Sequence, residues 1–265
     1  MSGRAKLRTI GERPALRLER RLKHPPEKVW HAITDPAELE HWFPAKVDVE
    51  LRDGGAIRFT FPGEDSTTTG RVVTADPPRE FTFVWNDDTL RWLISPDGDG
   101  SLLEFTHTFG RGDPAIAKLA GARTAAGWDA CLDALAARLA GREAAQPSGW
   151  HARMASYVEE FGLDEGEVRE DGTIRFRRDL GWKPVAELRP LLPDEPGWDL
   201  VHDPREGTRV EFTEAAGDDV PAQLARRHEQ LDKLFAATHG VEVPDWAPDR
   251  VEAVRKHYAA RPTEG

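Results

Sequence analysis

The sequence is poor in cysteine and has no surplus of positive charge. Cys131 is its one cysteine, so no disulfide can form within the chain, and a reduced, cytoplasmic location is the simplest expectation. The formal net charge over the 265 residues is −11. Because a protein without a basic surface gathers phosphates poorly, we expect no nucleic acid and no membrane as a partner. No apolar run is long enough to span a bilayer, and the first residues lack the apolar core of a signal peptide.

Motifs for metal binding and catalysis are also scarce. The nine histidines are scattered, and none stands at zinc-ligand spacing from a cysteine or a carboxylate. The sequence contains no Gly-rich phosphate loop and no Gly-x-Ser-x-Gly motif. Cys131 has no cationic neighbour at helical spacing, and we expect it to act as a packing residue. We therefore assign no catalytic residue, no metal and no cofactor, and expect no hydrolase or ATPase activity.

Period-two alternation dominates residues 16–108. The segment from Leu16 predicts a strand, two short helices follow it on either side of Asp35-Pro36, and Asp53-Gly54-Gly55 predicts a hairpin turn. Further apolar alternations are separated by turn residues, which is typical of an antiparallel meander. The predicted strands of this meander are residues 45–51, 56–61, 70–74, 80–85, 90–94 and 102–108.

The period then changes to that of a helix. Trp128, Leu132, Leu135 and Leu139 fall on one helical face within a segment, 114–141, that has no turn signal beyond isolated glycines. A long helix with one apolar stripe needs a surface to cover it, and the meander offers a sheet. We therefore predict an α+β domain in which a curved antiparallel sheet surrounds this helix.

This layout resembles the START-like helix-grip (SRPBCC) superfamily, and within it the domain named after the activator of heat-shock-protein-90 ATPase. The resemblance covers residues from about Leu16 to Gly141. It implies a cavity between sheet and long helix, which in known members holds lipids, polyketides or hormones. The residues that carry it are Arg20, Leu22, Pro26, Val29, Trp30, Thr34, Asp35, Pro36, Leu39, Trp42, Phe43, Gly54, Gly55, Asp76, Pro77, Pro78, Arg79, Leu103, Glu104, Phe105, Thr106, His107, Gly127, Trp128, Cys131, Leu132 and Leu135.

Aromatic side chains give the candidate ligand site. Phe and Trp at alternating positions of successive strands can line a cavity, or they can equally well form a closed core without a ligand. Strand alternation fixes one face at a time, so some of these side chains can point outward. If a ligand binds, we expect the lining to consist of Trp42, Phe61, Phe83, Trp92, His107 and Trp128, with Trp128 at the floor.

The second half resembles a truncated copy of the first. Residues 174–180 with Pro184 match the first strand and helix start, residues 207–213 match 100–106, and residues 220–239 match the long helix. We expect at most three strands there, and an apolar helix face that must pack on the first domain or on another subunit. The predicted organisation is a flexible arm (1–15), a helix-grip domain (16–145), a helical linker (146–171) and the truncated copy (172–265).

Three classes of function remain open at this point. The leading hypothesis is a cytoplasmic module that binds a small apolar ligand in the helix-grip cavity. The second is a protein-interaction module, chaperone-linked as the family name implies, or a homodimer. The third is a cyclase or hydrolase-type enzyme, for which the sequence contains no catalytic constellation.

Overall fold

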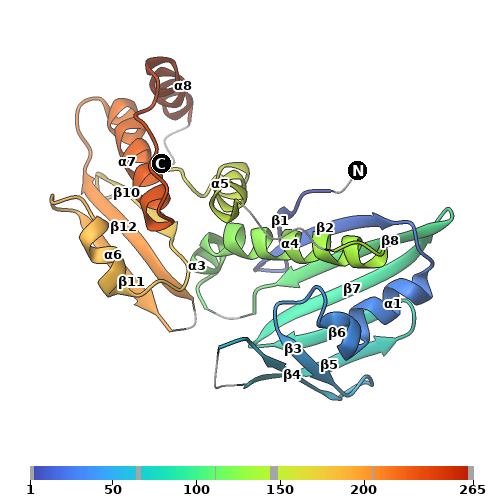
Figure 1. Ribbon diagram of the computed structural model, residues 1–265. Helices are drawn as coiled ribbons and strands as arrows, with labels where there is room; N and C mark the ends of the chain where they lie inside the picture. The colour runs from blue at the N-terminus through green and yellow to red at the C-terminus, as the bar shows by residue number, and fades with distance from the viewer. Residues whose placement is uncertain (1–2, 64–66, 111, 144–148, 205, 262–265) are drawn as a thin grey trace. The chain divides into compact units, whose positions relative to one another are not determined.

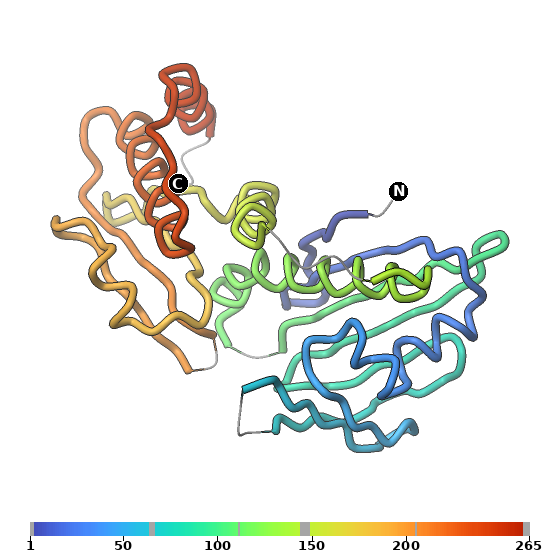
Figure 2. The backbone as a smooth tube through the Cα atoms, in the orientation of Figure 1, coloured from blue at the N-terminus to red at the C-terminus, as the bar shows by residue number. Residues whose placement is uncertain are grey.

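A computed structural model describes residues 3–63, 67–110, 112–143, 149–204 and 206–261. The chain divides into two compact units, Met1–Trp150 and His151–Gly265 (Figures 1 and 2). The division lies between residues 150 and 151, whereas we expected the first domain to end at residue 145 and a helical linker to follow. Residues 144–148, at the start of that linker, lie outside the described residues.

The first unit is built on one antiparallel sheet, as predicted. Among the described residues its order is β1-β2-β8-β7-β6-β5-β4-β3, and helix α4 lies along one face of it (Figure 1). The mixed α+β helix-grip architecture is thereby confirmed. The strands are β1 (Lys6–Ile10), β2 (Arg13–Leu22), β3 (Lys46–Val49), β4 (Ala56–Thr60), β5 (Thr67–Asp76), β6 (Glu80–Trp85), β7 (Asp88–Asp97) and β8 (Gly100–Thr108).

Aspartate caps set where two of the helices of this unit begin. The Asp35 carboxylate accepts hydrogen bonds from the amides of Ala37 and Glu38 at 2.9 and 3.3 Å, and Asp113 caps the next helix in the same way. The single helix predicted over residues 114–141 is two helices that meet at Ala120. The helices are α1 (Pro26–Thr34), α2 (Pro36–Leu39), α3 (Pro114–Leu119) and α4 (Gly121–Leu139).

The expected loose arm at residues 1–15 is wrong from Lys6 onward, because β1 and the start of β2 form a hairpin there. Gly11, with φ +61°, makes the turn, and Lys6 pairs with Arg17. Pro14 has no amide to donate to a neighbouring strand. It is accommodated near the strand's beginning, where its carbonyl accepts a hydrogen bond from the amide of Phe109 at 3.1 Å.

The second unit has a smaller antiparallel sheet, in the order β11-β12-β10-β9. Its strands are β9 (Glu167–Val168), β10 (Thr173–Asp179), β11 (Trp198–Asp203) and β12 (Gly207–Ala215). We expected at most three strands, and this is wrong because β9 adds a fourth. A strand of two residues is too short to show a periodic pattern in the sequence. The helical elements are α5 (Trp150–Glu160), α6 (Val185–Leu188), the 3₁₀ turn η1 (Arg189–Leu191), α7 (Val220–Thr238) and α8 (Pro248–Ala259).

The two sheets share a strand order and a register. The order β9-β10-β12-β11 parallels β1-β2-β8-β7. Arg178 pairs with Val210 as Arg20 pairs with Leu103. Trp198 pairs with Phe212 as Trp92 pairs with Phe105. Within the described residues, the smaller sheet has no counterpart of β3 to β6.

The apolar side of α7 is contacted from within its own unit. Leu224 packs on Gly166, where an added Cβ would come within 2.7 Å of the leucine. The ring of Phe235 lies 5.3 Å from that of His151, and the guanidinium of Arg178 lies over it. We expected this face to require the first domain or a second subunit, but α5, β10 and the segment before β9 already supply contacts to it.

Candidate functional site

All six predicted site residues lie in the first unit, and five of them are buried. Trp42 follows α2, Trp92 and His107 belong to β7 and β8, and Trp128 belongs to α4. Phe83 on β6 completes the buried set, whereas Phe61, just beyond β4, is half-exposed.

Trp128 is the centre of an aromatic cluster that joins the helix to the sheet. Its ring centroid lies 4.3 Å from that of Phe105, 5.6 Å from that of Trp92 and 5.9 Å from that of Phe43. Trp42 joins the cluster through Trp92 at 6.0 Å. Rings at these separations are in contact and contribute favourable edge and tilted interactions in addition to the burial of their area.

A polar relay runs through the same cluster. The indole Nε1 of Trp128 donates to Nδ1 of His107 at 2.9 Å, and Nε2 of His107 lies 2.8 Å from the carboxylate of Asp88. An indole nitrogen only donates, so Nδ1 must accept and the proton of the neutral imidazole sits on Nε2, from which it is donated to Asp88. The other Asp88 oxygen accepts the amide of Gly110 at 2.8 Å. Each member of the relay thus has its partner.

Asp88 was missed by the sequence analysis, although its position is fixed by local turn chemistry. Asn86 and Asp87 have φ of +49° and +75°, the left-handed conformations of a two-residue hairpin loop between β6 and β7. Gly110 packs against this loop, because a Cβ there would lie 1.7 Å from the carbonyl oxygen of Asp87. The Asn-Asp-Asp run predicts this turn from the sequence, but only the three-dimensional structure places it beside His107.

The half-exposed rings of Phe61 and Trp85 lie at the same end of the sheet as this relay. They stack with centroids 5.8 Å apart and planes inclined by 16°, and Trp85 also stacks on the buried Phe59 at 4.4 Å. Trp85 pairs with Asp88 across the β6–β7 ladder. An aromatic surface at the rim therefore continues inward to the buried cluster, with the polar relay beside it.

The other candidates for chemistry in this unit are structural. Burial raises the pKa of the Cys131 thiol to about 12, which keeps it protonated and unreactive near neutrality. Asp129 and Asp133, spaced like an acid–base pair on α4, both bind the buried guanidinium of Arg20. In the described part of the chain, no three potential metal ligands come together. None of the described helices is long and apolar enough to cross a membrane.

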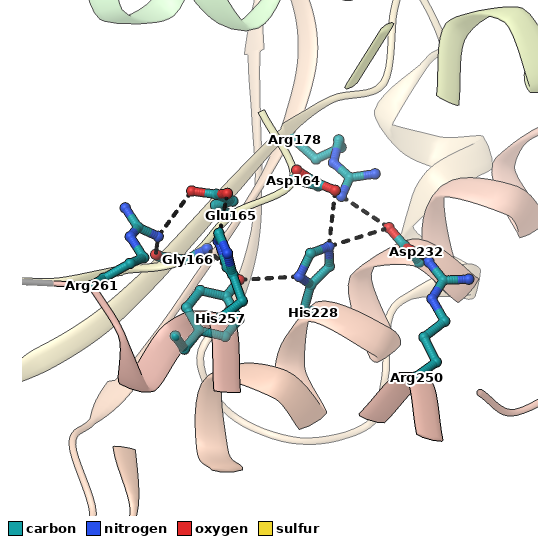
Figure 3. A network of polar contacts seen from close by, with 10 residues as sticks. Asp164, Glu165, Gly166, Arg178, His228, Asp232, Arg250, His257 and Arg261 are labelled. Atoms are coloured by element: carbon teal, nitrogen blue, oxygen red, sulfur yellow. Dashed lines mark hydrogen bonds and ion pairs between the residues drawn. The ribbon is translucent and has the colours of Figure 1, made fainter. Parts of the chain in front are cut away.

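A second polar network lies in the second unit (Figure 3). His228 on α7 bonds to Asp164 through Nε2 at 3.1 Å and to the hydroxyl of Tyr258 through Nδ1 at 3.1 Å. The same hydroxyl accepts the amide of Gly166 at 3.0 Å, so Tyr258 ties α8 both to α7 and to the segment before β9. Burial raises the pKa of Asp164, but the hydrogen bond and charge of His228 outweigh it and leave the pKa below its usual value.

The two units have different chemistry at matching positions, and in the second unit the guanidinium concerned is buried while its carboxylate partner is partly exposed. By register and helix position, Arg227 and Glu214 stand where the first unit has Trp128 and His107. They form a two-pronged ion pair with distances of 2.9 and 2.6 Å. The guanidinium lies 4.4 Å above the ring of Phe212, much as Trp128 packs on Phe105. The second unit thus has the same helix-to-sheet contact, with a partly buried charge pair where the first unit has its aromatic centre.

Comparison with known families agrees with the fold of the first unit. Residues 23–140 match the model of the family described as Activator of Hsp90 ATPase homolog 1-like protein. This segment is therefore similar to the domains of that family. The expected membership of the START-like helix-grip superfamily is thereby confirmed, and it places the first unit among ligand-binding or chaperone-related domains.

Solved structures with a similar arrangement come from several bacteria. CalU16 from Micromonospora echinospora is 26% identical, covers 61% of this chain and 96% of its own, and aligns with a TM-score of 0.48. A conserved protein of unknown function from Enterococcus faecalis, EF2215, is 20% identical with coverages of 60% and 90% and a TM-score of 0.49. The search of curated proteins found no significant match.

Proposed function

We propose that the first unit binds a small, largely apolar molecule at the end of the sheet where Phe61, Trp85 and the Asp88–His107 pair meet. The observation that carries this proposal is the stacked, half-exposed pair of Phe61 and Trp85, continuous through Phe59 with the buried aromatic cluster. Binding sites for small molecules combine apolar lining with a few placed polar groups, and here the relay supplies the polar group. Trp42, Phe83, Trp92 and Trp128 would form the inner wall, in agreement with the lining expected from the sequence.

The position of the relay favours binding over hydrolysis. A general base needs a ring nitrogen free to take a proton from substrate or water. Both nitrogens of His107 are already bonded, one to Trp128 and one to Asp88, so the imidazole is held as a fixed part of the wall. A cyclase or hydrolase mechanism would require this relay to open first.

A titration with a fluorescent apolar probe tests the proposal. We expect 1-anilinonaphthalene-8-sulfonate to bind the folded chain with saturation and to quench tryptophan emission. Trp85→Leu should weaken this binding by about tenfold, which corresponds to about 1.4 kcal/mol. Trp182→Leu, on an exposed tryptophan of the second unit, is the matched control and should leave the binding unchanged. Equal binding by both variants would contradict a site at Trp85.

The chaperone-linked alternative rests on the family description. It differs in what copurifies with the chain, because a ligand module carries a small molecule and a chaperone module carries a protein. Native mass spectrometry of the protein as isolated separates the two: a bound mass of a few hundred daltons supports the proposal, and a stoichiometric protein partner with no small molecule supports the alternative.

We further propose that the second unit is a truncated tandem copy of the first. The common strand order, the common register and the equivalent Arg20 and Arg178, each bound to a carboxylate of the long helix, support a shared origin. Because it lacks counterparts of β3 to β6 among the described residues and has Arg227 at the centre, its role is structural rather than ligand binding.

A further inference from the structure

We propose that strand β11 joins two copies of this chain, by antiparallel pairing of β11 with β11 across a twofold axis. The product is one continuous sheet in which β11 of each copy lies in the middle. This inference does not depend on ligand binding by the first unit, because it concerns the free edge of the other sheet.

Strand β11 is an edge whose outward hydrogen-bonding groups can be identified. The carbonyl of Gly197 accepts the amide of Thr213 on β12 at 3.0 Å, so the odd-numbered residues of β11 face β12. The backbone groups of Trp198, Leu200 and His202 consequently point away from the sheet. The outward amide of Leu200 bonds at 2.9 Å to the carboxylate of Asp199, its own neighbour.

The equivalent edge in the first unit is occupied. Ile94, the counterpart of Leu200, directs its amide to the carbonyl of Arg79 at 2.8 Å, and β6 then continues the sheet beyond β7. Helix α1 packs against β7 and β8, and the shorter α6 packs against β11 in the same way. In each unit this helix therefore packs on a face of the sheet, and among the described residues of the second unit no further strand pairs with the outer edge of β11.

The sequence of β11 is complementary to itself when the pairing is centred on Leu200. Asp199 then lies opposite Val201 of the second copy, and Trp198 lies opposite His202 of the second copy. No two like charges face each other directly, which an antiparallel ladder requires. The outward orientation of Leu200 also fits, because the central pair of such a ladder exchanges two backbone hydrogen bonds. Twofold symmetry is the commonest symmetry of protein dimers, and its interface must be complementary to itself. Two identical antiparallel strand edges meet this requirement.

Asp199 makes the association reversible. Natural sheet edges carry charged residues that discourage pairing with other strands. Here the carboxylate of Asp199 accepts the hydrogen bond of the Leu200 amide in the single copy, and in the dimer a carbonyl of the partner strand would accept it instead. With a net charge of −11 on each copy, repulsion opposes dimer formation, so added salt should favour the dimer.

Amide hydrogen exchange of the whole protein gives the sharpest test, because it distinguishes the two sides of one strand. We expect the amides of Asp199, Val201 and Asp203 to be protected at every protein concentration. The amides of Trp198 and His202 should exchange fast in dilute protein and slow down as the concentration rises, and the amide of Leu200, already bonded to Asp199, should slow down further. Exchange at these three amides that does not change with concentration overturns the proposal, because fast exchange would mean an unpaired edge and protection would mean that the same chain covers it.

Two variants at one exposed position check the dimer directly. His202→Pro removes an outward amide, whereas His202→Ala keeps it, and both lose the bond of His202 to Thr208. By sedimentation equilibrium we expect the dimer dissociation constant to rise about tenfold or more for the proline variant and to change little for alanine. A dimer that persists in the folded proline variant, or one that is lost equally in both, would place the interface elsewhere.

Discussion

At the residue scale, the buried side chain of His107 links the packed aromatic centre of the first unit by hydrogen bonds. His107 contacts Trp128 through one ring nitrogen and Asp88 through the other, and it is almost completely buried. A partner removed from a buried polar pair leaves the other group without water or protein to bond to, which costs more than the bond itself contributed.

Replacing His107 should therefore destabilise the protein through the group left behind. For His107→Phe we expect the free energy of unfolding to fall by about 1–3 kcal/mol, because the Trp128 N–H loses its acceptor. The double variant with Trp128→Phe should lose less than the sum of the two single changes. Urea unfolding followed by circular dichroism measures all three, and strictly additive losses would show that the two side chains do not interact.

At this scale, the sequence predicts which residues are aromatic and inward but not how they are joined. Alternation along β6, β7 and β8 indicated Phe83, Trp92 and His107 as candidates but left their direction open, and the structure buries all three. Asp88 lies nineteen residues before His107, and no periodicity links a hairpin turn to a neighbouring strand. The stacking of the half-exposed Trp85 on Phe61 at the rim likewise depends on how the strands pair.

Among the elements, helix α8 contacts its unit through several exposed ion pairs and one buried hydroxyl group, that of Tyr258. Tyr258 bonds to the amide of Gly166 and to His228, and its burial raises the pKa of the phenol well above its usual value, so it stays protonated. For Tyr258→Phe we expect a loss of about 1–3 kcal/mol and faster amide exchange at Gly166 and in α8.

His257→Ala is the control, because it removes an exposed ion pair with Glu165 from the same helix. Such pairs contribute about 0–1 kcal/mol. If the two variants lose the same stability, the buried hydroxyl is not what anchors α8.

Turn and cap residues made most elements predictable, and the exceptions share a cause. Asp35-Pro36, Asp53-Gly54-Gly55 and Asp113-Pro114 all mark real boundaries. Strand β1 escaped because its residues are largely exposed, so they show no inward alternation, and β9 escaped because it is too short. Edge strands of this kind are defined by a neighbouring strand rather than by their own sequence.

For the whole molecule, stability should fall in acid because carboxylates in both units are bound to arginine. Hydrogen bonds from Arg138 and Arg91 lower the pKa values of Glu38 and Glu80. Arg227 does the same for the pKa of Glu214. An unfolded glutamate takes up its proton near pH 4.3 and these folded ones only at lower pH, so their contribution is complete above that value and is lost as the pH falls through the folded pKa.

Thermal unfolding between pH 7 and pH 3 measures this effect. We expect a nearly constant midpoint down to about pH 5 and a steep decline below it. In the double variant Glu80→Gln/Arg91→Gln the decline should be shallower, because one such carboxylate is gone. A midpoint that rises on acidification would contradict the assignment.

The difference between Trp128 and His107 in the first unit and Arg227 and Glu214 in the second bears on the proposed duplication. Either charge introduced alone would lose its two-pronged partner at a largely buried position, leaving Arg227 only Glu195 and Glu214 only Arg226, a loss that can cost several kcal/mol and unfold a marginal domain. A lineage can cross such a barrier when the altered half is redundant, since the other half still performs the task. If the proposed duplication took place, the charge pair indicates that the second copy was no longer under selection for ligand binding. Related chains should then have either both charged residues or neither at these two positions.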